Sequence, residues 1–172
     1  MRELQTQRLL LRPYQSRDFE ELSSMLANPE LMRNIYHGHP LNLKEATAFI
    51  NRYMSNFSES DEVGLSSLCL KESGALIGLA GIVPCDYLGV EDVELGFLVV
   101  AEHQGKGYAT EAAKTIVAYC LNELKRGRLL ALVDPANVPS RRLIEGEQNL
   151  CMHFHAEIQT QERGPRRVYC LP

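Results

Sequence analysis

The segment from Val93 to Leu124 changes its hydrophobic period from two residues to nearly four across a short loop. At its start, apolar residues alternate with other residues, as they do on a strand with one buried face. The alternating residues are Val93, Leu95, Phe97 and Val99. From Ala109 onward, apolar residues recur every three or four positions for about four turns of an amphipathic helix. A strand that leads through a loop directly into a long helix predicts an α/β fold.

Further strands and helices are predicted on both sides of this unit. Strands are expected at residues 8–14, 65–71, 75–83, 129–133, 152–158 and 167–171, and helices at 16–27, from 43 onward and at 138–145. Asn28-Pro29 ends the first helix, and Asn42 with Glu45 has the spacing of a capping box at the start of the second. Gly127 is placed to end the long helix. This order predicts a mixed sheet with helices on both faces.

The composition is that of an ordinary globular chain, expected to form one domain over residues 1–172. With 18 Lys and Arg against 22 Asp and Glu, and a net charge of −4, the chain lacks the basic character of a nucleic-acid binder. No apolar run approaches the ~18 residues of a transmembrane helix, so no membrane partner is predicted. The N-terminus lacks a signal-peptide pattern, and a cytoplasmic location is expected.

The cysteines and histidines do not form a recognisable metal pattern. The five cysteines are widely spaced and contain no CxxC pair, so reduced thiols are expected. His37 with His39, and His153 with His155, are each spaced for one face of a strand, but no third ligand follows at a suitable distance. The sequence therefore predicts no metal site.

The loop before the long helix has the chemistry of an anion-binding site. Gly105 and Gly107 allow backbone N–H groups to approach a ligand closely. The helix that begins near Tyr108 presents unpaired N–H groups, and Lys106 adds a positive charge. Two known phosphate loops do not fit: Gly-Lys-Ser/Thr is absent, and Thr110 stands where the dinucleotide fingerprint needs its third glycine. These two kinds of nucleotide binding are therefore disfavoured.

A third pattern, Gln/Arg-x-x-Gly-x-Gly/Ala, is matched at every fixed position by Gln104, Gly107 and Ala109. It is the acetyl-CoA pyrophosphate loop of the GNAT N-acetyltransferase superfamily, which this chain resembles from about residue 6 to residue 145. Several strings resemble its branch of ribosomal-protein-alanine N-acetyltransferases. They are Thr6-Gln7-Arg8-Leu9-Leu10-Leu11-Arg12-Pro13, Leu76-Ile77-Gly78 with Gly81, Gly-Lys-Gly-Tyr-Ala-Thr-Glu-Ala at 105–112, and Val133-Asp134-Pro135-Ala136-Asn137 with Ser140 and Arg141.

This resemblance implies a fold and a cosubstrate. The fold is the α/β GNAT fold, a mixed, mostly antiparallel sheet of six or seven strands, splayed at its centre and flanked by about four helices. The cosubstrate is acetyl-CoA, whose pantetheine arm would lie along the strand before the loop, with its pyrophosphate held by main-chain N–H groups of the loop. The expected cofactor-binding residues are Phe97, Leu98, Val99, Gln104, Gly105, Lys106, Gly107, Tyr108, Ala109, Thr110 and Asn137.

The same resemblance gives two candidate catalytic residues. Glu94, two residues before Gly96, stands where a general base would act; the alternative is a solvated glutamate or one paired with an arginine. Ser140 is the remaining donor for the leaving thiolate, because many GNAT enzymes carry a tyrosine where this chain has Ile144. The alternative for Ser140 is a turn-capping serine. After Glu145 the sequence departs from the family pattern, which leaves the last two strands in doubt.

The predicted function is direct transfer of the acetyl group from acetyl-CoA to a primary amine, without a covalent enzyme intermediate. The acceptor is a protein N-terminal α-amine or a small-molecule amine, and a homodimer is possible. The alternative is a catalytically silent GNAT fold that binds acyl-CoA as a sensor or assembly module. Within the site, Lys106 is interpreted as a solvated loop charge rather than a required ligand, and Tyr108 as a packing residue. The alternative for Asn137 is a turn asparagine before a helix.

Overall fold

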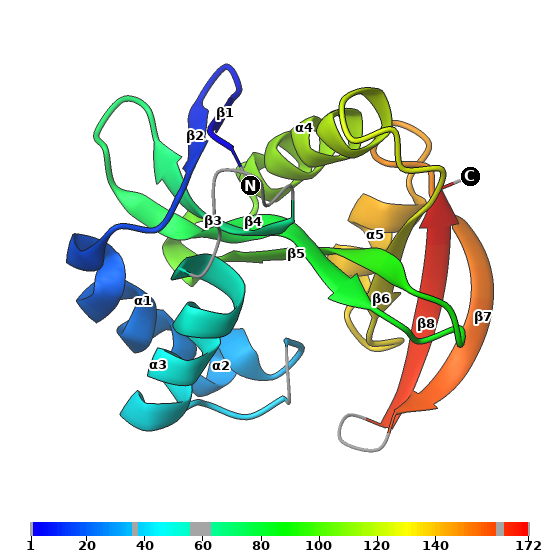
Figure 1. The fold of residues 1–172 in the computed structure, drawn as a ribbon, viewed down its shortest axis with the longest axis horizontal. Helices are drawn as coiled ribbons and strands as arrows, with labels where there is room; N and C mark the ends of the chain where they lie inside the picture. Colours follow the sequence, from blue (N-terminus) through cyan, green and yellow to red (C-terminus); the bar gives the residue numbers. More distant parts are fainter. Residues whose placement is uncertain (1, 36–37, 56–62, 161–163, 172) are drawn as a thin grey trace.

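The computed structural model describes residues 2–35, 38–55, 63–160 and 164–171 (Figure 1). Its strands form one sheet in the order β1-β2-β3-β4-β5-β6-β8-β7. Their bounds are β1 (Leu4–Gln5), β2 (Leu9–Arg12), β3 (Gly64–Leu70), β4 (Leu76–Cys85), β5 (Asp92–Val99), β6 (Leu129–Val133), β7 (His153–Thr160) and β8 (Gly164–Leu171). All neighbours are antiparallel except the parallel pair β5 and β6. The predicted mixed sheet is confirmed, but it has eight strands, because β1 adds an unpredicted edge.

The helices of the described residues are α1 (Phe19–Leu26), α2 (Pro29–Met32), α3 (Leu43–Ile50), α4 (Tyr108–Asn122) and α5 (Val138–Glu145). Short 3₁₀ turns at Ser16–Asp18 and Ala101–His103 and a π turn at Asn51–Ser55 accompany them. The capping box of α3 is confirmed: Asn42 Oδ1 accepts the Glu45 N–H, and Glu45 Oε2 accepts the Asn42 N–H. The sequence analysis missed α2, where Asn28 caps the helix and Pro29 opens it.

The end of α4 differs from the predicted glycine stop. The helix ends at Asn122, and Lys125 takes the left-handed conformation, with φ of 54°. The Arg126 N–H then donates to the carbonyl of Cys120 at 3.2 Å, which satisfies a carbonyl at the helix end. Gly127 lies beyond this turn, so its absent side chain is not what ends the helix.

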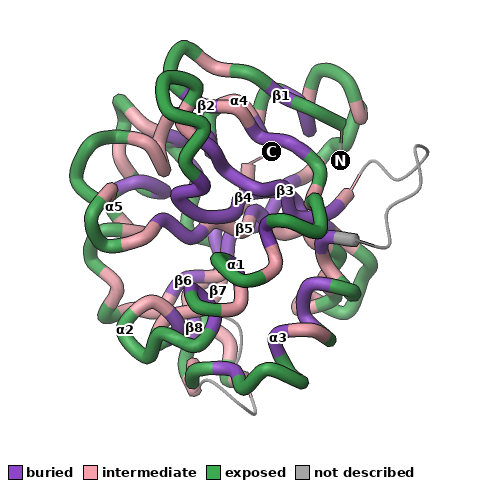
Figure 2. The backbone as a smooth tube through the Cα atoms, turned by 90° about the vertical axis from the view of Figure 1, so that its left-hand side faces the viewer, coloured by how far each residue is buried: buried purple, intermediate pink, exposed green. Residues whose placement is uncertain are grey.

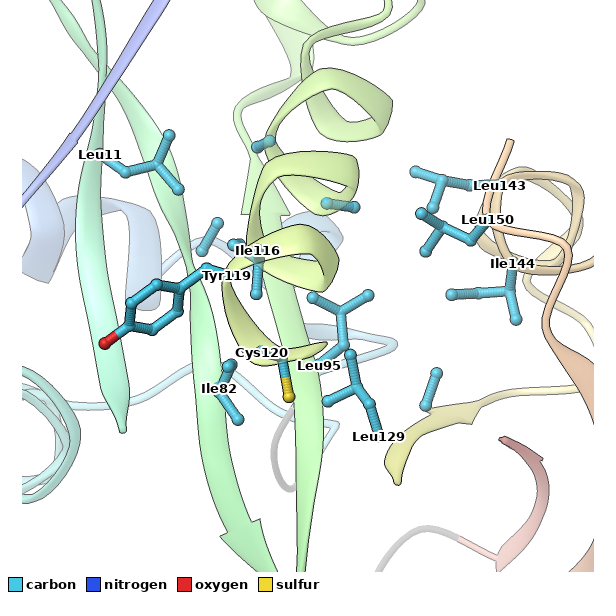
Figure 3. Close-up of a cluster of buried hydrophobic side chains, with 14 of the residues drawn as sticks. Leu11, Ile82, Leu95, Ile116, Tyr119, Cys120, Leu129, Leu143, Ile144 and Leu150 are labelled. Atoms are coloured by element: carbon cyan, nitrogen blue, oxygen red, sulfur yellow. The ribbon is translucent and has the colours of Figure 1, made fainter. Parts of the chain in front are cut away.

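Helices cover both faces of the sheet, as predicted: α4 lies on one side, and α1, α2 and α3 lie together on the other (Figure 1). The larger core cluster packs between α4 and the sheet and includes Leu11, Ile82, Leu95, Ile116, Cys120 and Leu129 (Figure 3). The second cluster, under α1 and α3, includes Leu22, Leu26, Phe49, Ile50, Leu79 and Leu98. Buried residues therefore lie along the central strands, while residues on the outer sides of the helices are exposed (Figure 2).

The centre of the sheet is splayed between β5 and β6. Eight residue pairs join β5 to β4, but Glu94 and Leu130 are the only register pair between β5 and β6. The two strands run parallel and share no register pair beyond this one, so their carboxyl ends lie apart. The predicted central opening is confirmed, and it lies directly before the loop that leads into α4.

Candidate functional site

A cavity of about 640 Å³ occupies the opening between β5 and β6. Its walls are β5 from Glu94 to Val99, the loop and first turn of α4, the end of β6, the first turns of α5, and residues 30, 31 and 33–35 in and after α2. Both candidate catalytic residues line it, together with every predicted cofactor-binding residue except Lys106. The fold therefore brings two distant parts of the sequence to one site, while the roles of these residues stay predictions.

The loop before α4 has the backbone conformation that its glycines predict. Gly105 and Gly107 have φ of 73° and 81°, in the left-handed region that favours glycine. Gly107 is the N-cap of α4, so the first N–H groups of this 15-residue helix open at the loop. A side chain at Gly105 would meet nothing within 4 Å, and one at Gly107 would lie 3.4 Å from Arg8 Nη2. Glycine is thus required here by the dihedral angles of the loop more than by crowding.

Gln104 holds the loop against the strand that precedes it. Its side-chain Nε2 donates to the carbonyl oxygen of Val99 at 2.8 Å. That carbonyl, one of the groups expected to face the pantetheine arm, therefore already has an internal donor. Lys106 lies outside the cavity wall and is exposed, as a solvated loop charge would be.

Arg8 contacts the glycine loop before α4 from outside the cavity, and the sequence analysis did not identify it as a site residue. Its Nη1 donates to the Lys106 carbonyl at 3.0 Å, and its guanidinium carbon lies 4.5 Å from the centre of the Tyr108 ring. Its Nε donates to Glu111 Oε2 at 2.7 Å. Burial alone would raise the pKa of Glu111, but hydrogen bonds from Thr6 and Arg8 outweigh it and lower the pKa. Arg8 and Glu111 both stood in the quoted family strings, yet only the fold joins them.

Glu94 lies at the point where β5 and β6 separate, on the cavity wall. Side chains two residues apart share a face of a strand, so Glu94 lies on the side of Leu98, which is covered by α1 and α3. Its Oε2 accepts a hydrogen bond from the hydroxyl of Tyr87 at 2.8 Å. The sequence analysis missed Tyr87, because nothing in the pattern around it indicates where the turn after β4 carries its ring.

Asn137 and Ser140 meet at the start of α5. Asn137 Oδ1 accepts the Ser140 N–H at 3.2 Å, so the asparagine caps this helix as well as lining the cavity. The turn before it is held by Asp134, which accepts the Ala136 N–H at 2.8 Å and pairs with the buried Arg166 at 3.2 Å. The structure therefore supports the turn interpretation of Asn137 without removing it from the cavity.

The segment after Glu145, where the sequence departs from the family pattern, folds back against α5. The Met152 N–H donates to the carbonyl of Ile144 at 2.9 Å, and Asn149 Nδ2 donates to the carbonyl of Arg142 at 2.9 Å. The side chains of Leu150 and Met152 are buried in the larger cluster. Strands β7 and β8 then form a hairpin, close to the predicted ranges. Ile144 is buried and lines the cavity, so the wall is hydrocarbon at that position.

Other site types find no support in the described ranges. Within them, no group of three or more His, Cys, Asp or Glu residues could hold a metal ion. His37, from one of the two histidine pairs, lies outside the described residues. None of the helices in these ranges is long and apolar enough to cross a membrane.

Comparison with known proteins gives the family. Residues 8–146 match the family described as Acetyltransferase (GNAT) domain. The uncharacterized N-acetyltransferase YnaD of Bacillus subtilis strain 168 is 30% identical over 140 residues, covering 81% of this chain and 78% of the relative. The chain belongs to the GNAT acetyltransferase family, whose members use acyl-CoA.

Solved structures agree with this assignment. An acetyltransferase from Agrobacterium tumefaciens strain C58 superposes with a TM-score of 0.83 at 26% identity, covering 100% of this chain and 95% of that one. The spermidine N-acetyltransferase of Vibrio cholerae, determined in complex with CoA and spermine, gives a TM-score of 0.75 at 16% identity, covering 95% and 94%. The second likeness is one of fold, and it comes from a protein that holds CoA.

Proposed function

We propose that this chain is an acetyl-CoA-dependent N-acetyltransferase that moves the acetyl group directly to a primary amine. The observation that carries the proposal is one continuous cavity, which joins the glycine loop, the opening between β5 and β6, and the side chains of Glu94 and Ser140. A binding module needs only the first two of these features. The two polar side chains in the cavity wall, Glu94 and Ser140, favour a catalyst.

The residues present fit the cosubstrate. Left-handed Gly105 and Gly107, at the N-terminus of α4, turn main-chain N–H groups toward an anion without a Cβ in the way. The loop from Gln104 to Thr110 would hold the pyrophosphate. The backbone of Phe97, Leu98 and Val99 would hold the pantetheine arm along the open edge of β5.

Two side chains would carry the chemistry. Glu94 takes the proton that the acceptor amine loses as the new C–N bond forms. Ser140 donates a hydrogen bond to the sulfur as the C–S bond breaks, which stabilises the thiolate. No base-activated serine arrangement was identified in the sequence, so we assign Ser140 as a donor and not as a nucleophile.

The acceptor would enter beside α2. Residues 30, 31 and 33–35 line the cavity, and α2 lies with α1 and α3 on the sheet face to which Glu94 belongs. Resemblance to the ribosomal-protein-alanine branch favours a protein N-terminal α-amine. The named activity of the Vibrio cholerae enzyme keeps small-molecule amines among the candidates. A cytoplasmic location, a single domain and a homodimer stay predictions.

Thiol release from acetyl-CoA tests the proposal directly. The purified protein is assayed with a panel of peptide α-amines, lysine peptides, polyamines and amino sugars, and acetyl-CoA affinity is measured in parallel by titration. Turnover with at least one amine is expected. Tight binding of acetyl-CoA without thiol release across the panel would instead support the catalytically silent alternative. The observation that favours this alternative is Ile144, a buried hydrocarbon side chain where many GNAT enzymes carry a tyrosine acid.

A further inference from the structure

Glu94 has a neutral hydrogen-bond donor that comes from outside the cavity. The hydroxyl of Tyr87 lies 2.8 Å from Glu94 Oε2, while Tyr87 itself is not part of the cavity wall. The tyrosine is half-buried in the turn that joins β4 to β5. It therefore contacts the carboxylate without being part of the cavity wall itself.

We propose that Tyr87 is a positioning residue that orients the carboxylate of Glu94 toward the acceptor amine. The proposal rests on the proposed function, in which Glu94 takes the proton of that amine. A glutamate side chain has three rotatable bonds, and Glu94 stands at the one register pair of β5 and β6, next to the opening between them. A phenol that holds one carboxylate oxygen restricts the rotation of the whole carboxylate. Efficient proton transfer requires this kind of alignment.

A phenol differs from a cation in its effect on a nearby carboxylate. Asp92, two residues before Glu94 on β5, is paired with Arg128. Cys85 is also close, and burial first, then the charges of Glu94 and Asp92, raise its pKa to about 12, so the thiol is neutral at physiological pH. Asp86 adds a further negative charge. A cation bonded to a carboxylate favours its charged form strongly and weakens it as a base, whereas a neutral hydroxyl does so less.

A double-mutant cycle tests whether Tyr87 acts through Glu94. Tyr87→Phe, Glu94→Gln and the double variant are compared on the best acceptor, and acetyl-CoA affinity and melting temperature are measured for each. Tyr87→Phe should lower kcat about tenfold and leave the affinity for acetyl-CoA unchanged. In the Glu94→Gln background the same change should cost nothing further, because no base is left to orient. Tyr14→Phe, which removes a phenol hydroxyl on α1's side of the sheet, is the matched control.

Each other outcome overturns the proposal. An undiminished kcat for Tyr87→Phe would show that the hydrogen bond does not serve catalysis. Losses that multiply in the double variant, or a fall in melting temperature that accounts for the lost activity, would make Tyr87 a purely structural residue. If Glu94→Gln is slow while Tyr87→Phe is normal, the proposed function stands and only this inference fails. If the wild-type protein binds acetyl-CoA but acetylates no amine, both fail.

Discussion

Among individual side chains, the importance of Glu94 depends on the acceptor it serves. An α-amine, with a pKa near 7.8, is about one-third neutral at pH 7.5, whereas a lysine amine near 10.4 is only about 0.1% neutral. With an α-amine acceptor, Glu94→Gln should slow the reaction about ten- to a hundredfold. The loss should shrink toward about pH 9, where solvent removes the proton. The pH–rate profiles of both proteins decide this, and a loss that is independent of pH would make Glu94 a positioning group.

Ser140 offers a second test of the same reaction. Its N–H is occupied by the Asn137 side chain, while the residue lines the cavity. Ser140→Ala should lower turnover about ten- to a thousandfold, the effect of losing one transition-state donor or acid. Acetyl-CoA affinity should stay nearly constant, because the loop and not Ser140 holds the cosubstrate. An acetylated enzyme intermediate, or ping-pong kinetics, would contradict direct transfer.

Among the elements, the loop into α4 is the one whose backbone geometry matters most. Gly107→Val forces a β-branched residue to φ of 81° and brings its Cβ to 3.4 Å from Arg8. We expect it to weaken acetyl-CoA binding more than tenfold, a loss of more than about 1.4 kcal/mol. Lys106→Ala should change binding only a few-fold, because the side chain is exposed outside the cavity. Titration of both variants tests this, and Gly127→Val, at a glycine with open space and no left-handed φ, is the control. A larger loss for Lys106→Ala would assign the affinity to charge.

In the molecule as a whole, a buried ion pair ties the N-terminal segment to the sheet. Arg12 of β2 and Asp18 share two hydrogen bonds, of 2.6 and 2.7 Å, and Ser67 of β3 donates to Asp18 at 2.9 Å. Asp18→Asn would leave the Arg12 charge unpaired and should cost about 3–5 kcal/mol of unfolding free energy. Chemical denaturation measures this, with the exposed Glu20→Gln as control. A loss below about 1 kcal/mol would mean that the pair contributes no more than a surface pair does.

The same pair predicts how stability depends on pH. Burial alone would raise the pKa of Asp18, but hydrogen bonds from Arg12, the Gln15 N–H and Ser67 lower it below its ordinary value. A carboxyl whose folded-state pKa is depressed stabilises the fold fully above its unfolded pKa, near 3.9. The contribution is lost as pH falls below that value. Stability of the wild type should therefore fall more steeply below about pH 4 than that of Asp18→Asn.

The sequence by itself determined the features that depend on neighbouring residues. The alternation over β5, the glycines at 105 and 107, and the Asn42–Glu45 capping box act within a few positions of the chain, so their conformations follow from local sterics and hydrogen bonding. Local rules also left errors. They indicate only that Pro29 follows the end of a helix, although it also starts α2. They predict that Gly127 ends α4, whereas Lys125 is the residue that takes the left-handed conformation after the helix.

Tertiary structure alone decided what surrounds the predicted residues. Arg8 and Glu111 are 103 positions apart, and they meet because α4 packs against the sheet beside β2. Tyr87 is only seven residues from Glu94, yet their contact depends on the path of a turn that no local pattern specifies. The opening between β5 and β6 exists because strands distant in sequence pair at one position and then diverge. Contacts of this kind depend on the packing of the whole chain, and no short stretch of sequence contains them.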